Sequence, residues 1–468
     1  MSAGATPRPS SAGAQRVGAI VIGAGAAGLA AAATLRRAGL DVRVLEAGEA
    51  PGGVVRSERV GGYLVEHGPN TLRVSGPARA ALAELGVEAL LVPAAAANRL
   101  RFLWDGRRLQ PLPTGPLGAL TTPLVSLRGK LRIMAEPLVR RGDAAGETVA
   151  GFVGRRLGSE AVERLVGPFL TGVYAGDERA LGAEAVFPSL VEAERRGGSI
   201  VRGLLAARRR RGNLPAALPG IHSCADGLGA LPAHLAGELG ERLALGTPAA
   251  DLACEAGGLR VETAHGAAGA LWSDRVVLAA PAPAAADLLR PLDARAAELL
   301  AGIDHAPLVV SHLGVAATGV RHPLEGFGFL VPRAAGLGLL GCLFLSNLFA
   351  GRAPEGRTLL TCMLGGTRWR EAVDAPEDLL RAHLLSDLDR TLGLRAEPEL
   401  LRTVRWPRAV PQPGPDHPRR MAELRARLAA LAEPDGARIE PAGAWLGGVS
   451  LADTLASGVA AARRLLDR

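Results

Sequence analysis

Three glycines near the N-terminus have the spacing of a nucleotide-binding loop. Gly23, Gly25 and Gly28 follow an apolar run at 18–22 and precede an Ala-rich stretch, 29–37, that predicts a helix. The first glycine of such a loop turns the chain, the second lets the backbone approach a pyrophosphate, and the third lets the helix pack on the strand. The start of the helix then offers amide hydrogens to the phosphates. The pattern predicts a dinucleotide site; its alternative is a helix entry in a Gly-rich chain.

An acidic residue and a second glycine pair extend this pattern. Residues 42–45 predict a strand that ends at Glu46, whose carboxylate would accept hydrogen bonds from ribose hydroxyls and favours FAD or NAD over NADP. Gly52 and Gly53 follow soon after. Because the ribityl chain and ring of a flavin extend past the pyrophosphate, a second close approach of the backbone favours a flavin. Two ordinary glycine turns are the alternative.

The elements that must position these residues predict an α/β fold in several pieces. Strand and helix patterns mix at the beginning, middle and end of the chain, so we expect a nucleotide-binding part built from discontinuous segments. Between them lie a helical region, 115–205, and a region of short apolar runs, 308–364, that is typical of an antiparallel sheet. Helices are predicted at 376–393 and 417–432, and a strand, turn and helix at 443–466.

Composition and charge exclude several classes of protein. The chain has 468 residues, 48% apolar and 21% charged, which excludes a disordered protein and favours about three lobes. The net charge of +8 includes one dense basic run, Arg208–Arg211, without aromatic residues that could stack on bases. We therefore expect a solvated loop there and no nucleic-acid partner; binding of an acidic ligand or of anionic lipid headgroups is the alternative. Apolar stretches at 17–35 and 334–351 contain too many small or polar residues for membrane spans.

The cysteines and histidines predict neither a disulfide framework nor a metal site. The four cysteines lie far apart and none forms a CxxC pair, and the nine histidines are scattered. A reducing cytoplasm fits this usage. We therefore expect no metal, and chemistry carried by an organic cofactor.

Further short sequence motifs follow one another along nearly the whole chain. They are GPN at 68–70, RFLW at 101–104 with LP at 112–113, RRLG at 155–158, GVYAGD at 172–177, FPSL at 187–190, GFGFLVP at 326–332 and MLGG at 363–366. Together with the glycine loop, this set resembles the oxygen-dependent protoporphyrinogen oxidase family, within the FAD-dependent amine oxidase and phytoene desaturase superfamily. The set is far more specific than the glycine loop alone.

The resemblance implies where FAD would bind. The implied residues are Gly23, Ala24, Gly25, Ala26, Ala27, Gly28, Glu46, Ala47, Gly53, Val54, Gly68, Pro69, Asn70, Thr71, Ala249, Trp406, Val449, Ser450 and Leu451. The last three open a predicted helix, whose dipole would stabilise negative charge on the ring. Pro413, Ala452 and Thr454 depart from the family's pattern and leave the packing around the flavin open.

The substrate implied by the resemblance is a porphyrinogen, a large apolar macrocycle with propionate side chains. Arg101 matches the arginine that holds a propionate, since a guanidinium fork suits a carboxylate; its alternative is a surface arginine. Four positions are implied to enclose the ring or to leave room beside it: Leu330, Leu343, Met363 and Gly172. Taken alone, each of these would be an ordinary core residue.

The implied reaction moves a hydride from a methylene bridge to the flavin, three times over, and passes the electrons to molecular oxygen. No strong protein base is required, so Asn70 and Arg101 are the catalytic candidates and act by orientation. Three alternatives stay open. They are the oxidation of coproporphyrinogen III by the same chemistry, an amine oxidase or carotenoid desaturase, and a tetrapyrrole-binding module without turnover.

The expected organisation interleaves three lobes. We expect a Rossmann-like FAD-binding domain at 17–100, 225–285 and 405–468, a mixed-sheet substrate domain at 101–114, 206–224 and 286–404, and a helical lobe at 115–205, after a disordered tail at 1–16. The helices of the lobe either contact a membrane surface or simply cover the substrate cavity. A peripheral position on the inner face of the cell membrane and a homodimer both stay open.

Overall fold

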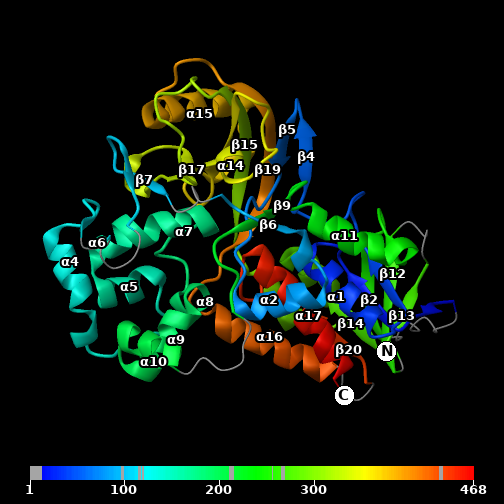
Figure 1. Cartoon of the computed structure of the whole chain (residues 1–468). Helices are drawn as coiled ribbons and strands as arrows, with labels where there is room; N and C mark the ends of the chain where they lie inside the picture. Colours follow the sequence, from blue (N-terminus) through cyan, green and yellow to red (C-terminus); the bar gives the residue numbers. More distant parts are fainter. Residues whose placement is uncertain are drawn as a thin grey trace, which may run out of the picture.

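A five-stranded parallel sheet positions the glycine-rich loop. The computed structural model describes residues 13–95, 100–113, 118, 121–209, 216–255, 257–264, 269–431 and 436–467. The sheet has the strand order β10, β3, β2, β14 and β20, and its neighbouring strands are all parallel. In that order the strands are Leu243–Ala244, Val42–Leu45, Ala19–Ile22, Arg275–Leu278 and Arg438–Pro441. The sheet therefore draws on the beginning, middle and end of the chain (Figure 1).

Helix α1, which follows the loop, is buried along most of its length. It spans Ala26–Arg37, so it begins three residues earlier than predicted, and it lies beside α17, Leu451–Leu466 (Figure 1). Small residues allow the close approach, since a Cβ atom on Gly458 would lie 2.0 Å from the carbonyl oxygen of Ala27. Helices α2 (Gly76–Glu84) and α11 (Ala230–Leu239) share the same apolar core.

The opposite face of this sheet is covered by a second set of helices. They are α12 (Ala282–Leu289), α13 (Ala294–Ala301) and α16 (His417–Leu431). Ile20 and Ile22 of β2 pack on this side, whereas Ala19 and Val21 pack toward α1. This alternation follows from the period of two residues in a strand, and it makes the sheet the middle layer of three.

A second, seven-stranded sheet forms the other large layer. Its order is β19, β15, β18, β17, β16, β7 and β8, and its pairs are antiparallel except for β16 with β7. In that order the strands are Glu399–Pro411, His305–Ala316, Arg357–Gly365, Leu339–Phe344, Gly328–Leu330, Phe102–Trp104 and Leu109–Pro111. Helix α15 (Glu377–Leu392) covers one face of this sheet through its apolar side, and α14 (Leu345–Leu348) follows β17.

Smaller sheets correct two expectations from the sequence. Strand β1 (Gln15–Arg16) pairs with β13 (Leu271–Ser273), so the predicted disordered tail is wrong at these two residues, and residues 1–12 lie outside the described part. Strands β12 and β11, Gly258–Thr263 and Ala249–Glu255, complete that sheet. The strand predicted at 443 is also wrong: β20 ends at Pro441, and Gly443, with a φ of 145°, ends the extended run.

Two short antiparallel pairs complete the described strands. Strands β4 (Ser57–Val60) and β5 (Tyr63–Glu66) form a hairpin that leads directly into residues 67–70. Strands β6 (Leu91–Pro93) and β9 (His222–Cys224) pair with each other, and an isolated bridge joins His222 to Leu72.

The described residues between β8 and β9 are mainly helical, as predicted for 115–205. Its helices are α4 (Leu127–Met134), α5 (Val149–Leu157), α6 (Ser159–Ala161), α7 (Gly167–Tyr174), α8 (Ala183–Val186), α9 (Pro188–Gly197) and α10 (Ile200–Arg209). They form a separate lobe, seen at the left of Figure 1. Arg208 and Arg209 belong to α10, so the predicted loop is wrong for these two residues, and 210–215 lie outside the described residues.

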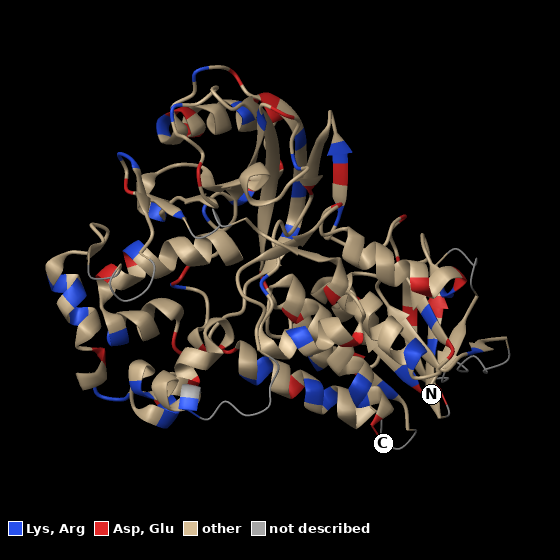
Figure 2. Ribbon diagram, in the orientation of Figure 1, with Lys and Arg blue, Asp and Glu red and all other residues tan. Residues whose placement is uncertain are grey.

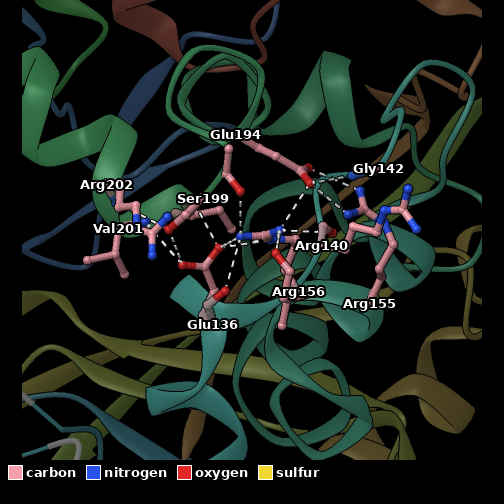
Figure 3. Close-up of polar contacts among 12 residues, drawn as sticks. Glu136, Arg140, Gly142, Arg155, Arg156, Glu194, Ser199, Val201 and Arg202 are labelled. Carbon is pink, nitrogen blue, oxygen red and sulfur yellow. Dashed lines mark hydrogen bonds and ion pairs between the residues drawn. The ribbon is translucent and has the colours of Figure 1, made fainter.

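A buried ionic network holds this lobe together and accounts for the RRLG segment. The side chains of Arg156 and Glu136 are both 0% exposed and form an ion pair, and Ser199 donates to Glu136 over 2.6 Å (Figure 3). Arg156 also reaches Glu194 over 3.2 Å, and Arg155 reaches the same carboxylate over 2.7 Å. Burial alone would raise the pKa of Glu136, but hydrogen bonds from Ser199 and Arg156 hold it below its usual value.

Charges of both signs are spread over the surface of all three lobes. Figure 2 shows basic and acidic residues distributed over the helices and strands, with several basic residues on α4 and on α16. Among the described residues, no helix is long and apolar enough to cross a membrane. Cys224, Cys342 and Cys362 are not part of a disulfide among the described residues, although the sulfur atoms of Cys342 and Cys362 lie 3.6 Å apart.

Candidate functional site

The glycine loop has the backbone shape that the spacing predicts. Gly23 has a φ of 102°, and a Cβ atom there would lie 2.8 Å from the carbonyl oxygen of Ala279. A Cβ atom on Gly28 would lie 1.8 Å from the carbonyl oxygen of Gly23, so α1 can pack on β2 only with glycine at this position. At Gly25, in contrast, a Cβ atom would meet nothing within 4 Å. The loop therefore leaves open space at Gly25, beside the N-terminus of α1.

The second glycine pair lies directly against this loop. The amide of Gly52 donates to the carbonyl oxygen of Ala24 over 2.8 Å, and Gly25 and Gly52 form an isolated parallel bridge. A Cβ atom on Gly53 would lie 3.4 Å from the Cα atom of Gly25. The two glycine segments thus form one backbone surface on the same side of α1.

Glu46 links the end of β3 to the loop. Its Oε2 atom accepts from the amide of Ala24 over 2.6 Å, and its Oε1 atom accepts from the amide of Gly48 over 2.7 Å. The carbonyl of Glu46 accepts from Thr247 over 2.7 Å, which brings the segment leading to Ala249 alongside. Ala47, next to Glu46, is exposed. Each carboxylate oxygen keeps acceptor capacity beyond its one bond to the backbone.

Asn70 presents an unpaired atom next to these segments. The GPN segment packs on residues 52–56, where a Cβ atom on Gly68 would lie 2.2 Å from the carbonyl oxygen of Val54. The Nδ2 atom of Asn70 donates to the carbonyl of Gly68 over 3.1 Å. Its Oδ1 atom is buried and has no hydrogen-bond partner among the described residues. Since an unpaired buried acceptor is costly, this atom fits a donor on a bound group. Pro69 and Thr71 flank it.

Four predicted residues share one face of the seven-stranded sheet. Leu330 pairs with Gly341, which pairs with Met363, and Leu343 lies two residues along the same strand from Gly341. Directly paired residues, and residues two apart on a strand, lie on one face. By the same register Trp406, paired with Leu308, also lies on this face. The four residues on this face are Leu330, Leu343, Met363 and Trp406.

The helical lobe closes over this face at Gly172. A Cβ atom on Gly172 of α7 would lie 2.5 Å from Cδ2 of Leu330, so the helix approaches the sheet closely only with glycine here. The space beside Gly172 is filled by the Leu330 side chain. Further along, Ala175 adopts a φ of 48° and accepts from Thr367 over 2.8 Å, which ties the GVYAGD segment to the end of β18.

Arg101 lies at the edge of the same apolar surface. It directly precedes β7, and its guanidinium carbon lies 4.8 Å from the centre of the Phe327 ring. Phe327 packs in a cluster with Leu343 and Met363. Burial lowers the pKa of Arg101, and the charge of Arg73 lowers it further. Among the described residues the Arg101 guanidinium has no acidic partner, so it fits an anionic ligand better than a structural salt bridge.

The turn at 449–451 meets the helical lobe and β19. Val449 packs in a cluster with Tyr174 and Val410, and Ser450 caps α17 by accepting from Asp453 over 3.1 Å. Burial raises the pKa of Tyr174 to about 12, and the charge of Asp453 acts in the same direction. A small cavity is lined at this junction by Tyr174, Val449, Gly448, Pro411 and Pro413, among others.

The three departures from the family's pattern have ordinary local roles. The carbonyl of Pro413 accepts from Gly182 over 2.9 Å, and Thr454 donates its hydroxyl to the carbonyl of Ser450 over 2.9 Å. Ala452 is buried against the α1 core. Gln412, which precedes Pro413, donates to the carbonyl of Tyr174 over 2.7 Å. The turn is therefore held without the side chains that are replaced.

The residues that could hold FAD thus come from five parts of the chain. They are the two glycine segments, Glu46, the segment 68–71 with its unpaired Asn70 oxygen, and the turn at 449–451. The open space at Gly25 and the buried acceptor of Asn70 both fit this group. Among the described residues, no three His, Cys, Asp or Glu side chains are placed to hold a metal ion.

The structure adds residues that reasoning from the sequence missed. Glu66 and Arg352, both 1% exposed, form a buried pair with 3.3 Å between Oε1 and Nη1, and Ser57 donates to Glu66 over 2.5 Å. Desolvation raises the pKa of Glu66 to about 7, against hydrogen bonds and the Arg352 charge that lower it. Arg73, whose charge adds to burial in lowering the pKa of Arg101, is the second addition. No local signal identifies either, because the partners are far apart in sequence.

Comparisons with known proteins agree with this arrangement. A family model described as flavin containing amine oxidoreductase matches residues 26–466. The chain is 34% identical over 417 residues to the chloroplastic protoporphyrinogen oxidase of Nicotiana tabacum, covering 84% of this chain and 76% of that one. It is 29% identical over 462 residues to coproporphyrinogen III oxidase of Bacillus subtilis, covering 94% and 96%. A solved structure from Exiguobacterium sp. 255-15, described as a candidate protoporphyrinogen oxidase, superimposes with a TM-score of 0.80 at 27% identity, covering 97% and 99%.

Proposed function

The chain belongs to the flavin-containing amine oxidoreductase family and, within it, to the protoporphyrinogen oxidases, and we propose that it oxidises protoporphyrinogen IX to protoporphyrin IX in porphyrin biosynthesis. It is an oxidoreductase, and its cofactor is FAD. Molecular oxygen is the proposed electron acceptor. The interleaved domain boundaries given above belong to this proposal.

One observation carries the choice of substrate. Leu330, Leu343 and Met363 form an apolar surface on one face of a sheet. The guanidinium of Arg101, which has no acidic partner among the described residues, lies at the edge of this surface, over Phe327. An apolar surface with a cation at its edge is complementary to a macrocycle that is hydrophobic over most of its area and carries carboxylates along one side. An amine substrate, which is itself cationic, would be repelled by this guanidinium.

The residues of the chain act by binding and orientation. A bound flavin supplies a two-electron acceptor for hydride transfer. The apolar surface excludes water and holds the macrocycle, and Arg101 binds a carboxylate at the edge of the macrocycle. Asn70 holds the segment 68–71 through its amide nitrogen, and its amide oxygen stays available to the flavin ring. Glu46 and the open face at Gly25 are the proposed partners of the ribose and the pyrophosphate.

Oxidation of coproporphyrinogen III is the second candidate. The similarity to the Bacillus subtilis coproporphyrinogen III oxidase, along almost the full length of both chains, favours it specifically. The two substrates differ in the number of propionates, so the cations around the rim would set the preference.

Anaerobic mixing with each substrate separates these candidates. The purified flavin-loaded protein is mixed with protoporphyrinogen IX and, in parallel, with coproporphyrinogen III, and the loss of flavin absorbance is followed. We expect faster bleaching by protoporphyrinogen IX, and slower bleaching of an Arg101→Gln variant by either. Faster bleaching by coproporphyrinogen III would select the second candidate, and bleaching by neither would defeat both. The matched control is Arg107→Gln, an exposed arginine in the β7–β8 turn.

We also propose that the helical lobe contacts a membrane surface. Nine of the thirteen exposed large apolar side chains among the described residues lie in this lobe. Leu127, Leu131, Met134 and Leu138 recur at helical spacing along α4 and the turn after it, and Leu138 is 83% exposed. Arg128, Lys130 and Arg132 lie on the same helix, where Figure 2 shows a basic group. This combination favours anionic headgroups over a plain cover for the cavity.

Flotation with liposomes tests this contact. With vesicles that contain an anionic lipid, at low salt, we expect the protein to float, and a Leu131→Glu and Leu138→Glu double variant to stay in the soluble fraction. Leu379→Glu, an exposed leucine on α15, is the matched control and should float like the wild type. A wild type that stays soluble would defeat the contact. A cytoplasmic location and a homodimer remain predictions from the sequence.

A further inference from the structure

His67 is bound through its side chain as well as through its backbone. Its imidazole Nε2 atom lies 2.9 Å from Oε2 of Glu58, and its amide donates to the carbonyl of Arg56 over 2.8 Å. The amide bond continues the β4–β5 ladder by one residue, so Glu58 and His67 are diagonal neighbours on one face of the hairpin. His67 is therefore held from two sides at the point where the chain leaves β5.

Glu58 is oriented in turn by an arginine of another sheet. The guanidinium of Arg402, on β19, donates through Nε to Oε2 over 3.0 Å and through Nη2 to Oε1, and this two-point contact fixes the plane of the carboxylate. The hydrogen bond from Arg402 is the largest cause that holds the pKa of Glu58 below its usual value. An ionised carboxylate can only accept, so the proton of the bond between Glu58 and His67 lies on Nε2 of the imidazole.

Arg402 and Trp406 reach His67 from the same strand. They are four residues apart on β19 with no register shift between them, so they lie on one face of the seven-stranded sheet. Trp406 binds the carbonyl of His67, and Arg402 reaches its imidazole through Glu58. One strand of the large sheet thus holds this residue by its backbone and by its side chain.

A separate, buried contact secures the hairpin. Glu66, which precedes His67, pairs with Arg352, and both of these side chains are 1% exposed. The side chains of His67 and Glu58 are 21% and 32% exposed instead. Partly exposed pairs add little to stability, because water screens them, so the contact between His67 and Glu58 fits a role in orientation better than a role in folding.

Only two residues separate His67 from Asn70, and both restrict the backbone. A Cβ atom on Gly68 would lie 2.2 Å from the carbonyl oxygen of Val54, and Pro69 has a φ fixed by its ring. A rotation at His67 is therefore passed on to Asn70, whose Oδ1 atom is buried without a partner among the described residues. The orientation of His67 thus sets where this acceptor points.

We propose that His67 is a positioning residue for FAD, whose imidazole, held by Glu58 and Arg402, fixes the segment 68–71 that presents Asn70 to the flavin ring. This inference rests on the proposed function, since it takes the contact of segment 68–71 with FAD from it. His67 acts through the backbone of this segment and not by binding the substrate. Loss of the imidazole should loosen the segment without unfolding the hairpin.

A double-mutant cycle on FAD affinity tests the proposal apart from turnover. The FAD-loaded full chain is diluted in steps, and the return of free flavin fluorescence gives the dissociation constant for the wild type, His67→Ala, Glu58→Ala and the double variant. We expect each single variant to bind FAD about fivefold more weakly, and the double variant to be no weaker than either single one. Single effects that multiply in the double variant would overturn the inference, and so would unchanged affinities.

A conservative variant and a matched control separate orientation from folding. His67→Gln retains an amide donor toward Glu58 and should recover most of the FAD affinity that His67→Ala loses, while the two variants unfold at the same urea concentration. Arg59→Ala breaks an exposed ion pair with Asp226 on the same strand, β4, and should bind FAD like the wild type. An equal loss of affinity in Arg59→Ala, or no recovery in His67→Gln, would contradict a specific role for the imidazole.

Steady-state kinetics at saturating FAD give a second readout. In His67→Ala we expect kcat for protoporphyrinogen IX to fall by about fivefold and KM to stay within about twofold. The reason is that the orientation of the flavin affects the chemical step, whereas the apolar surface that binds the macrocycle is unchanged. A raised KM at unchanged kcat would place His67 in substrate binding and overturn the inference.

The two proposals fail in different ways. If the wild type shows this cycle in FAD affinity but oxidises no porphyrinogen, the proposed function fails and the inference about His67 holds. If the wild type oxidises protoporphyrinogen IX and His67→Ala keeps its FAD affinity, the inference fails alone. Should His67→Ala not fold, His67→Gln and Glu58→Ala decide, because the first keeps the contact and the second removes it. Equal FAD affinities in these two variants would overturn the inference.

Discussion

Trp406 and His67 lie 339 positions apart in the chain and are joined by a hydrogen bond, in which the indole Nε1 donates to the backbone carbonyl of His67 over 2.7 Å. Trp406 belongs to β19 of the seven-stranded sheet, whereas His67 directly precedes Gly68. The bond therefore holds the segment that carries Asn70 against the sheet face that carries Met363.

Replacing Trp406 by phenylalanine keeps an aromatic ring but removes the donor. The carbonyl of His67 then loses a partner worth about 1–2 kcal/mol, and we expect FAD to dissociate about tenfold more readily. The dissociation constant is measured by the return of free flavin fluorescence. Trp369→Phe is the control, because Trp369 lies against His383, with ring centroids 5.0 Å apart, and α15 covers the other face of the sheet. Equal losses in the two variants would contradict the role of the hydrogen bond.

Gly458→Ala should separate α1 from α17. The new Cβ atom would lie 2.0 Å from the carbonyl oxygen of Ala27, which cannot move without shifting α1. We expect the free energy of unfolding to fall by about 1–3 kcal/mol, as in other overpacked cores, and FAD affinity to fall with it. Urea unfolding and flavin titration measure the two effects.

Gly237→Ala is the matched control for this helix contact. Gly237 lies in α11, and a Cβ atom there meets nothing within 4 Å. The same substitution should here stabilise the protein by about 0.5–1 kcal/mol, because alanine favours the helix. A destabilised Gly237→Ala, or an unchanged Gly458→Ala, would contradict the account of close packing.

Arg156→Met should unfold the helical lobe more readily than the rest of the chain. It leaves Glu136, 0% exposed, without its ion-pair partner, and loss of one member of a buried pair costs about 3–5 kcal/mol. Limited proteolysis followed by mass spectrometry should find new cleavage sites between 121 and 209. Arg195→Met removes an exposed partner of Glu192 on α9 and should leave the digestion pattern unchanged. New sites outside the lobe would contradict a local role.

Glu66 predicts a pH dependence of stability. Desolvation raises its pKa from 4.5 to about 7 in the folded chain. A raised pKa means that folding favours the protonated form, so this contribution is complete below about pH 4.5 and is lost as the pH rises through about 7. Relative to Glu66→Gln, the wild type should lose on the order of 3 kcal/mol of unfolding free energy across this range. Urea unfolding at a series of pH values measures the difference.

The pKa of Glu58 is shifted in the opposite direction to that of Glu66, so Glu58→Gln serves as the control. A hydrogen bond from Arg402 is the largest cause that lowers the pKa of Glu58, so its contribution is present above its unfolded pKa and is lost as the pH falls. The Glu58→Gln variant should therefore differ from the wild type least in acid. A Glu66→Gln variant whose stability runs parallel to that of the wild type from pH 4.5 to 7 would contradict the assignment.

Local features were predictable because nearby residues determine them. Strand β3 has the predicted bounds, 42–45, and α15 spans 377–392 against a prediction of 376–393. The glycine loop was predictable from the spacing of its glycines, although Gly23 and Gly28 also lie close to Ala279, which is far along the chain. Helix α1 itself begins earlier than predicted, because Ala26 and Ala27 take helical backbone inside the glycine pattern.

Features that depend on distant partners were not predictable. Strand β19, Glu399–Pro411, has an arginine at every few positions and a proline inside it, and its extended form depends on pairing with β15, where nine of its thirteen residues have a partner. It spans the predicted boundary between 404 and 405. The buried contact between Glu66 and Arg352 arises in the same way, because the two residues lie far apart in the chain. The sequence carries no local mark of either.

The packing of α1 against α17 has a consequence for how the protein is made. The loop and α1 leave the ribosome early, but α17 is synthesised more than 400 residues later. Until then the Ala-rich surface of α1 has no α17 to bury it, and β14 and β20, which complete the sheet beside β2, are also still missing. Flavin loading is therefore a late event during biogenesis, and a nascent chain halted before 451 would expose the α1 surface to chaperones.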